Sequence, residues 1–173
     1  MDSLDFVVLV DVNDQQIGIM EKLEAHQKGE LHRAFSIFIF NSQNQLLLQQ
    51  RSHTKYHSPL LWTNTCCSHP RPNENILEAA NRRLFEEMGI EGLKLKNVDT
   101  LLYRSKMENG LIEHEFDYIF IGKSDDSPKF NIDEVEAYKY LSMDDIKELV
   151  RQNPADFTEW FKIILPKLPF YHH

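Results

Sequence analysis

Apolar residues in the first third of the chain gather in short runs separated by turn residues. Residues 5–12 (DFVVLVDV), 33–40 (RAFSIFIF) and 46–51 (LLLQQR) have the length and composition of strands. The first run is followed by the turn residues 13–14, and the polar stretch 41–45 joins the other two as a hairpin without glycine. This part of the chain is therefore predicted to be mainly β-structure.

The middle of the chain contains one segment with helical periodicity, residues 76–88 (ILEAANRRLFEEM). Four apolar residues fall on one face of that helix: Leu77, Ala80, Leu84 and Met88. Gly89 follows directly and is a typical helix stop. The pattern predicts a central helix that buries one face.

The remainder of the chain continues with strands and ends with helices. Strands are predicted at 99–106 and 111–122, with a turn at 108–110, and at 135–141; helices are predicted at 143–152 and 157–165. No repeat or Gly/Ser-rich linker divides the sequence. We therefore expect one domain over residues 1–173, an α/β (α+β) sandwich built on a mixed sheet.

Composition and charge exclude several classes of protein. The 173 residues include 19 basic and 27 acidic side chains, a net charge of −8, which argues against a nucleic-acid-binding surface. The only two cysteines, Cys66 and Cys67, are adjacent and cannot join distant segments, as expected of a reduced, cytoplasmic protein. The acidic start is unlike a signal peptide, and no apolar run approaches the ~20 residues of a membrane span.

Charged residues on the central helix divide into two groups. Glu78, Arg82 and Glu86 form one column on the side away from the apolar face, as expected of a solvated surface. Arg83 and Glu87 form a second pair close to the apolar face, where charges need partners. The pair fits either a boundary ion pair or a metal-binding carboxylate beside an anion-binding arginine.

The segment from residue 68 to residue 90 resembles the Nudix box, GX5EX7REUXEEXGU, where U is a bulky aliphatic residue. The matching positions are Glu74, Arg82, Leu84, Glu86, Glu87, Gly89 and Ile90. Ser68 replaces the first glycine, and Arg83 replaces the glutamate that is a principal metal ligand in Nudix hydrolases. The arginine favours holding a diphosphate intact, because its fork of donors matches phosphate oxygens.

Histidines and glutamates elsewhere supply candidate metal ligands. Four of the eight histidines lie in polar or terminal segments and are expected to be exposed: His53, His57, His172 and His173. His26 and His32 flank a short loop, and His69 lies two residues after Cys67.

Downstream, Glu113 and Glu115 would share one face of a strand, with His114 on the other. Two neighbouring carboxylates fit either an edge strand facing water or a site that holds a cation. Three imidazoles and two carboxylates would form a mixed nitrogen and oxygen ligand set. Such a set is typical of an octahedral site for a divalent ion such as Mn²⁺, or Zn²⁺, and not of a tetrahedral thiolate site. Spacing alone does not show that the five residues converge.

Taken together, the motifs resemble type I isopentenyl-diphosphate Δ-isomerase, a family of Nudix-fold enzymes of isoprenoid biosynthesis. They are TNTCCSHP, the modified Nudix box, EKLEAH with LHRAFS, LLLQQRS, EHEFDY and the late Trp160-Phe161. The resemblance covers residues 5 to about 165. It implies a Nudix-type α/β/α sandwich and interconversion of isopentenyl and dimethylallyl diphosphate through a tertiary carbocation-like state.

The resemblance also implies roles for individual residues. Cys67 and Glu115 would transfer protons, Tyr103 would lie near the double bond, Trp160 would face the cationic centre, and Cys66 would only pack. Four cationic side chains would hold the diphosphate: Lys22, Arg51, Lys55 and Arg83. Glu87 and the backbone carbonyl of Cys67 would bind a Mg²⁺ that enters with it. A second divalent ion, Mn²⁺, Zn²⁺ or Mg²⁺, would be held by His26, His32, His69, Glu113 and Glu115.

Two other functions remain open from the sequence. One is a Nudix pyrophosphatase acting on a nucleotide or isoprenoid diphosphate. Arg83 argues against this function, because it replaces the expected metal-binding glutamate. The other is a catalytically silent domain that senses a diphosphate, which would be expected to lack Cys67, Glu115 or Trp160. We expect a small isoprenoid diphosphate as substrate, no nucleic-acid or membrane partner, and a monomer or weak homodimer.

Overall fold

The computed structural model describes residues 6–169 and 171. Asp5, the first residue of the predicted strand 5–12, and His172 and His173 lie outside this range. The described chain forms one mixed sheet of nine strands. The strands are β1 (Phe6–Val10), β2 (Gln16–Glu21), β3 (His32–Phe40), β4 (Leu46–Arg51), β5 (Trp62–Thr63), β6 (Cys66–Ser68), β7 (Lys96–Lys106), β8 (Ile112–Lys123) and β9 (Val135–Leu141).

Strand β3 is the centre of the sheet. It runs parallel to β8 along its whole length, and its other edge pairs in turn with β1, β6 and β4. The remaining pairs are antiparallel: β1 with β2, β4 with β5 and β9, and β7 with β8. Residues from β6 and β8 therefore lie on the two sides of β3.

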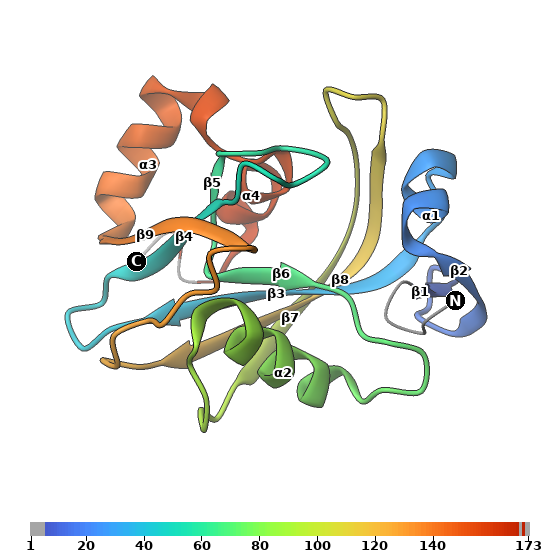
Figure 1. Ribbon diagram of the computed structural model, residues 1–173, viewed down its shortest axis with the longest axis horizontal. Helices are drawn as coiled ribbons and strands as arrows, with labels where there is room; N and C mark the ends of the chain where they lie inside the picture. Colours follow the sequence, from blue (N-terminus) through green and yellow to red (C-terminus); the bar gives the residue numbers. More distant parts are fainter. Residues whose placement is uncertain (1–5, 170, 172–173) are drawn as a thin grey trace.

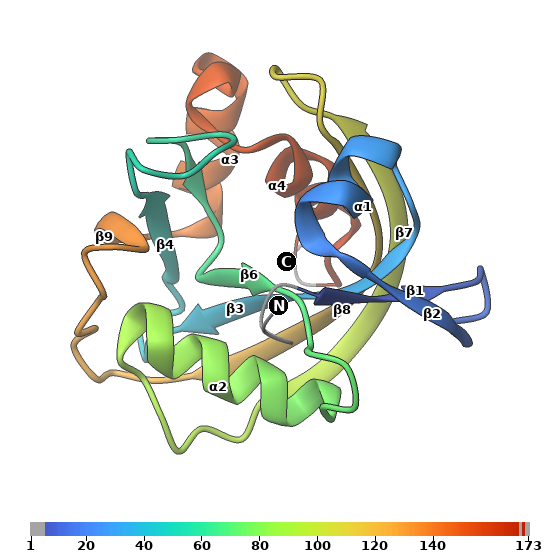
Figure 2. The ribbon, with the colours of Figure 1, turned by 45° about the vertical axis from the view of Figure 1, so that its right-hand side comes forward.

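Helices cover both faces of the sheet (Figure 1). They are α1 (Lys22–Lys28), α2 (Ile76–Met88), α3 (Met143–Gln152) and α4 (Glu159–Ile164), with short 3₁₀ turns at Pro154–Asp156 and Leu165–Lys167. Helix α2 lies against one face, α3 and α4 lie on the other, and α1 lies beside one end of β8 (Figures 1 and 2). Among the described residues, no helix has both the length and the apolar character needed to cross a bilayer.

Alternation along β3 builds a separate core on each face of the sheet. Phe35 and Ile37 pack in the core that contains Leu84 of α2. Phe38 points the other way and stacks on Phe161 of α4, with ring centroids 6.5 Å apart. Because side chains alternate along a strand, one continuous apolar run supplies both layers of an α/β/α sandwich.

Helix α2 begins and ends where the sequence predicts. The side chain of Asn75 accepts hydrogen bonds from the first-turn amides of Leu77 and Glu78. Gly89 ends the helix with φ 66°, and a Cβ at that position would lie 2.5 Å from the carbonyl oxygen of Lys129. A glycine is therefore required there, for both conformation and space.

One residue of the predicted apolar face of α2 is not buried. Leu77 is 41% exposed, whereas Ala79, which the pattern did not select, is fully buried. The contact face at the start of the helix is turned toward Ala79, whose small side chain lets the helix approach the sheet. Ala80, Leu84 and Met88 are fully buried as predicted.

Four short elements were not predicted. Strand β2 is an edge strand whose apolar residues, Ile17 and Ile19, face outward, so its alternation does not mark a buried face. Helix α1 has seven residues and depends on its caps, Glu21 and the left-handed Gly29. Strands β5 and β6 have two and three residues and exist only through pairing with β4 and β3. The predicted final helix is also shorter, because Thr158 is its N-cap.

Candidate functional site

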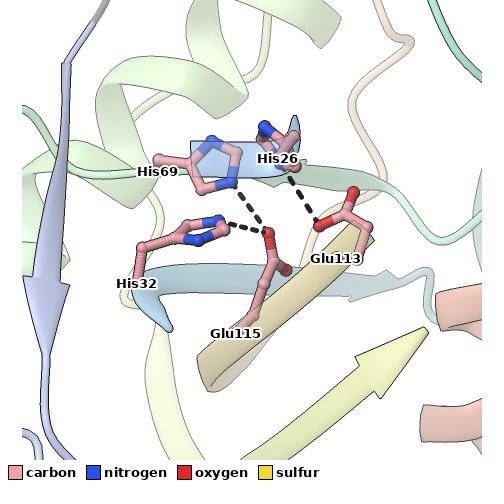
Figure 3. A group of neighbouring side chains, drawn as sticks. All are labelled: His26, His32, His69, Glu113 and Glu115. Carbon is pink, nitrogen blue, oxygen red and sulfur yellow. Dashed lines mark hydrogen bonds and ion pairs between the residues drawn. The ribbon is translucent and has the colours of Figure 1, made fainter. Parts of the chain in front are cut away.

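Five side chains from four separate segments meet at one point (Figure 3). His26 comes from α1, His32 begins β3, His69 follows β6, and Glu113 and Glu115 lie on β8. One potential ligand atom from each lies within 4.8 Å of all the others. The strand register places His32 directly beside Glu115, and alternation along β8 brings Glu113 to the same face.

Backbone carbonyls determine which nitrogen of two of these histidines carries the proton. His26 Nδ1 lies 2.7 Å from the carbonyl oxygen of Lys22, and His32 Nδ1 lies 2.9 Å from that of Glu30. Because a carbonyl oxygen only accepts, each Nδ1 must donate, and in a neutral ring each Nε2 then presents a lone pair to the cluster. This is the usual second-shell arrangement of metal-binding histidines.

The cluster is incomplete as a hydrogen-bond network. His26 Nε2 and Glu113 Oε2 are buried and have no hydrogen-bond partner within the described range. His32 Nε2 lies 3.1 Å from Glu115 Oε2, so two acceptors face each other unless a proton or a cation lies between them. Three nitrogens and two carboxylates therefore fit a divalent cation, which would satisfy all these atoms.

The surroundings of Glu115 and His69 shift the pKa values of both side chains. Burial would raise the pKa of Glu115, but its interaction with the Glu113 side chain and its hydrogen bonds with His32 and Tyr103 outweigh burial and lower that pKa. Burial lowers the pKa of His69, which favours a neutral ring. Glu115 is therefore held as a carboxylate, and its Oε1 accepts a 2.5 Å hydrogen bond from the Tyr103 hydroxyl on the adjacent strand β7.

The two cysteines point to opposite faces of β6. Cys66 is fully buried in the core beneath α2, whereas Cys67 lines a cavity on the other face. The Cys67 sulfur lies 3.0 Å from Asn64 Oδ1 and 3.5 Å from Ser36 Oγ. Burial, with a contribution from the Asp117 carboxylate, raises the pKa of Cys67, so the thiol form is favoured.

The cavity beside Cys67 brings most of the predicted site residues together. Its walls are Lys22, Arg51, Lys55, Tyr56, His57, Cys67, Ser68, His69, Arg83, Glu87, Tyr103, Glu113, Glu115 and Trp160. Trp160, from α4, is 2% exposed, and its ring lies 5.0 Å from the guanidinium carbon of Arg51. The indole and the guanidinium thus form one wall of the cavity.

A second, more polar cavity adjoins the first. The two share Lys22, Lys55, Ser68, His69 and Arg83, and the second adds Arg71, Arg82, Glu86 and Glu134. We call this second cavity the outer end, and the first cavity, which is lined by Trp160 and by His69, Glu113 and Glu115 of the His/Glu cluster, the inner end. Five of the eleven residues that line the outer end are lysines or arginines, against two glutamates.

Carboxylates already pair with the cations of the outer end. Arg83 Nη2 lies 2.5 Å from Glu87 Oε2 and 3.4 Å from Glu134 Oε2, and Lys55 also pairs with Glu134. Glu87 is 4% exposed, and its other oxygen accepts from Gln49 Nε2 at 2.9 Å. The Arg83–Glu87 pair thus joins a part-buried guanidinium to a buried carboxylate, and it lies on a cavity wall.

Two arginines at the site retain donors that nothing satisfies. The Nε atoms of Arg51 and Arg83 are buried, and neither has an acceptor in the part of the chain that the structure describes. Burying unsatisfied donors is costly. Both positions are therefore suited to donate to an anion that enters the cavity.

The prediction that His57 is an exposed loop residue is wrong. It is 5% exposed, with Nε2 3.7 Å from Glu113 Oε1 and its ring at 87° to that of Trp160, 5.6 Å between centroids. Burial lowers its pKa to about 3, so the ring is neutral. Its loop is folded over the cavity by two contacts with the β7–β8 turn: Ser58 N to Glu108 Oε1, 2.8 Å, and Asn109 Nδ2 to the Tyr56 carbonyl, 2.8 Å.

Sequence reasoning missed other residues around the site. Asp117 is fully buried, and one of its oxygens accepts from Ser36 Oγ at 2.7 Å. Its signal was present, because Asp117 continues the alternation of Glu113 and Glu115 along β8. Glu134 lies in a turn before β9, and no pattern in the sequence links it to Lys55 and Arg83.

Comparison with known proteins identifies the family of this fold. Residues 30–161 match the NUDIX domain. The crystal structure of DR0079 from Deinococcus radiodurans superposes with a TM-score of 0.76 at 19% identity, covering 92% of this chain and 96% of that one. The MutT protein from Methanosarcina mazei Go1 gives a TM-score of 0.62 at 16% identity, covering 79% and 91%. These likenesses show the fold.

Sequence relatives are much closer. The isopentenyl-diphosphate Delta-isomerase of Pectobacterium atrosepticum is 54% identical over 165 residues, which cover 95% of this chain and 92% of the relative. Isopentenyl-diphosphate Delta-isomerase 2 of Aromatoleum aromaticum is 47% identical over 164 residues, covering 95% and 86%. The similarity therefore extends over almost the full length of both relatives.

Proposed function

Because the chain belongs to the isopentenyl-diphosphate Delta-isomerase family and carries its NUDIX domain, we propose that it interconverts isopentenyl and dimethylallyl diphosphate in the two-ended cavity. The observation that supports this most strongly is the arrangement of the inner end. A thiol, Cys67, and a carboxylate, Glu115, line the same chamber as the indole of Trp160. The protein is an isomerase that moves a carbon–carbon double bond.

The two ends of the cavity suit the two ends of the substrate. The outer end, with Lys22, Lys55 and Arg83, would hold the diphosphate, and the buried Nε donors of Arg51 and Arg83 would add hydrogen bonds. The inner end would hold the five-carbon chain against Trp160. Binding energy from the diphosphate then orients carbons that offer no polar handle of their own.

The reaction needs one proton added and one removed. The C3–C4 π electrons take a proton at C4, which leaves a tertiary cation at C3. Loss of a proton from C2 then leaves its electron pair as the π bond of the new C2–C3 double bond. Cys67 and Glu115 come from strands on either side of β3, so they can reach the chain from different directions. We assign them the two proton transfers, with Tyr103 holding the Glu115 carboxylate in place.

Charge that develops at C3 must be stabilised without a nucleophile. The face of the Trp160 indole attracts a cation through its quadrupole, an effect of about 2 kcal/mol or more in a dry site. His57 and Tyr56 close the chamber from the loop side, which limits the access of water that would capture the cation. Trp160 therefore serves as a cation-stabilising wall.

The residues also fit two divalent ions. His26, His32, His69, Glu113 and Glu115 would hold one, Mn²⁺, Zn²⁺ or Mg²⁺, consistent with the unpartnered atoms of the cluster. Glu87 and the backbone carbonyl of Cys67 would hold a Mg²⁺ that enters with the diphosphate. When bound, these ions supply positive charge that neutralises the buried carboxylates and the diphosphate.

Proton and phosphorus NMR of the protein with isopentenyl diphosphate and Mg²⁺ test this function. We expect dimethylallyl diphosphate to form while both phosphorus signals remain those of a diphosphate ester. Release of phosphate or pyrophosphate would contradict the proposal and make the protein a Nudix hydrolase. An unchanged spectrum, with metal shown to fill the His/Glu cluster, would leave a diphosphate-binding domain.

A further inference from the structure

A chain of buried hydrogen bonds connects the start of α4 to the Cys67 thiol. Thr158 Oγ1 donates to Thr63 Oγ1 at 3.0 Å, and Thr63 Oγ1 donates to Asn64 Oδ1 at 2.9 Å. The same Asn64 oxygen lies 3.0 Å from the Cys67 sulfur. Thr158 and Asn64 are fully buried and Thr63 is 2% exposed, so water does not compete for these bonds.

The donors and acceptors of Asn64 determine how its side-chain amide is oriented in this series of hydrogen bonds. Asn64 Nδ2 donates to the carbonyl oxygens of Ile37, at 3.0 Å, and Cys66, at 3.1 Å, which uses both amide hydrogens. A flipped amide would place its oxygen against those carbonyls, so Asn64 Oδ1 must face Thr63 and Cys67. Asn64 Oδ1, at 3.0 Å, is therefore the nearer of the two acceptors within reach of the Cys67 S–H group, the other being Ser36 Oγ at 3.5 Å.

The other end of the chain holds the indole. Thr158 is the N-cap of α4 and accepts from the amide of Phe161 at 3.3 Å, so its hydroxyl hydrogen is left for Thr63. Trp160 lies in the first turn of this helix. A single buried network thus fixes both the thiol and the cation-stabilising ring, which face the same cavity.

We propose that Thr63, Asn64 and Thr158 are positioning residues that set the direction of the Cys67 S–H group and hold it relative to Trp160. This inference rests on the proposed function and adds three residues that touch no substrate. Small displacements of a reacting group are costly in catalysis. Removing one of these hydrogen bonds is therefore expected to lower kcat. Diphosphate binding, at the other end of the cavity, is expected to be retained.

Thr65 provides a matched control in the same segment. It is fully buried like Asn64, but its hydroxyl donates to the Leu47 carbonyl at 2.6 Å and accepts from the Ile39 amide at 3.0 Å. Both partners belong to the sheet and neither contacts the thiol. Thr65→Val removes a buried hydroxyl of the same kind without touching the chain to Cys67.

Substitutions of Thr63 and Thr65 test the proposal by steady-state kinetics and thermal stability. Thr63→Val is expected to lower kcat about tenfold, with KM changed less than about twofold, because the position of the thiol and not diphosphate binding is affected. Thr63→Ser retains the hydroxyl and is expected to restore kcat. Thr65→Val is expected to lower thermal stability and leave kcat near the wild-type value.

Infrared spectroscopy gives a readout that does not depend on turnover. In a Cys66→Ala background, the S–H stretching band reports Cys67 alone. Thr63→Val is expected to shift this band and Thr65→Val to leave it unmoved, because only the first changes the bonding of the S–H acceptor. A wild-type protein that fails to isomerise its substrate would contradict the proposed function. The shift of the S–H band in Thr63→Val would still show whether the hydrogen bonds through Thr63 and Asn64 position the thiol.

Two results would overturn the inference. One is an S–H band that stays in place in Thr63→Val. The other is an equal loss of kcat in Thr63→Val and Thr65→Val, which would mean that buried hydroxyls act on stability alone. Thr158→Val breaks the chain from its other end and is expected to repeat the loss of kcat, together with the stability loss of a removed helix cap.

Discussion

The inner and outer ends of the cavity differ in how their charged side chains are compensated. At the inner end, the carboxylates of Glu113 and Glu115 face histidine nitrogens, and two buried atoms, His26 Nε2 and Glu113 Oε2, have no hydrogen-bond partner among the described residues. At the outer end, Arg83 and Lys55 are already paired with Glu87 and Glu134. The inner end therefore needs a cation to be complete, whereas the outer end exchanges internal partners for a substrate.

This difference separates chemistry from binding. Residues of the inner end are expected to control the rate of proton transfer and the stability that depends on a bound ion. Residues of the outer end are expected to control the affinity for the diphosphate. Substitutions at each end should therefore change different kinetic constants, and a variant that changes kcat and KM equally would contradict this division of roles.

The largest effect is expected from Cys67→Ala at the inner end. Loss of a proton-transfer group should lower kcat about a thousandfold or more, while the affinity for isopentenyl diphosphate remains nearly unchanged. Steady-state kinetics and isothermal titration with the substrate measure the two quantities. A variant that retains most of its turnover would remove Cys67 from the mechanism.

Metal removal is expected to have the next largest effect. A chelator should abolish turnover and lower Tm, because the buried carboxylates and histidines of the cluster lose the cation that neutralises them. Adding back Mn²⁺ or Zn²⁺ should restore both, as followed by calorimetry and metal analysis. Chelation of the Glu113→Gln variant, which lacks one ligand of the cluster, is the control. If the Tm of the wild-type protein is the same with and without metal, the assignment of the cluster as a metal site is contradicted.

At the outer end, Arg83→Gln is expected to raise KM tenfold to a hundredfold with a smaller change in kcat. The magnitude follows from the roughly 1.5–3 kcal/mol of a charge-assisted hydrogen bond. Arg33→Gln is the matched control, since Arg33 forms a part-buried ion pair with Asp14 away from both cavities. A large fall in kcat with unchanged KM would place Arg83 in the chemical step instead.

Glu134→Gln should give the smallest effect and the opposite sign. Glu134 pairs with both Lys55 and Arg83, so a diphosphate must displace it or share them. Removing its charge is expected to lower KM two- to fivefold, because like charges near a bound anion are unfavourable. A raised KM would mean that Glu134 holds the two cations in position and that the outer end is prearranged.

Periodic patterns in the sequence predicted the parts of the fold that depend on local structure. Helix α2 occupies the predicted residues 76–88 and ends at the predicted glycine stop. The same periodicity placed Glu87 and Arg83 beside the apolar face, where the structure has a part-buried ion pair. Alternation along β8 put Glu113 and Glu115 on one side of the strand, and the sheet register then brought them to the histidines.

Long-range contacts were the part that local patterns could not supply. His57 is buried because its loop is folded against the β7–β8 turn, a contact between segments about 50 residues apart. Strands β5 and β6 are too short to carry a pattern and exist through their neighbours. Glu134 reaches Lys55 across 79 positions of the sequence, and that pairing depends only on the folded sheet.

Deuterium labelling tests whether the inner end moves two protons while the outer end holds the diphosphate. The wild-type protein would be given isopentenyl diphosphate and Mg²⁺ in D₂O, and the product would be examined by proton and deuterium NMR. We predict dimethylallyl diphosphate with deuterium in the methyl group that derives from C4, and no such product from Cys67→Ala. A product without solvent deuterium would indicate direct hydrogen migration within the substrate and would contradict the account.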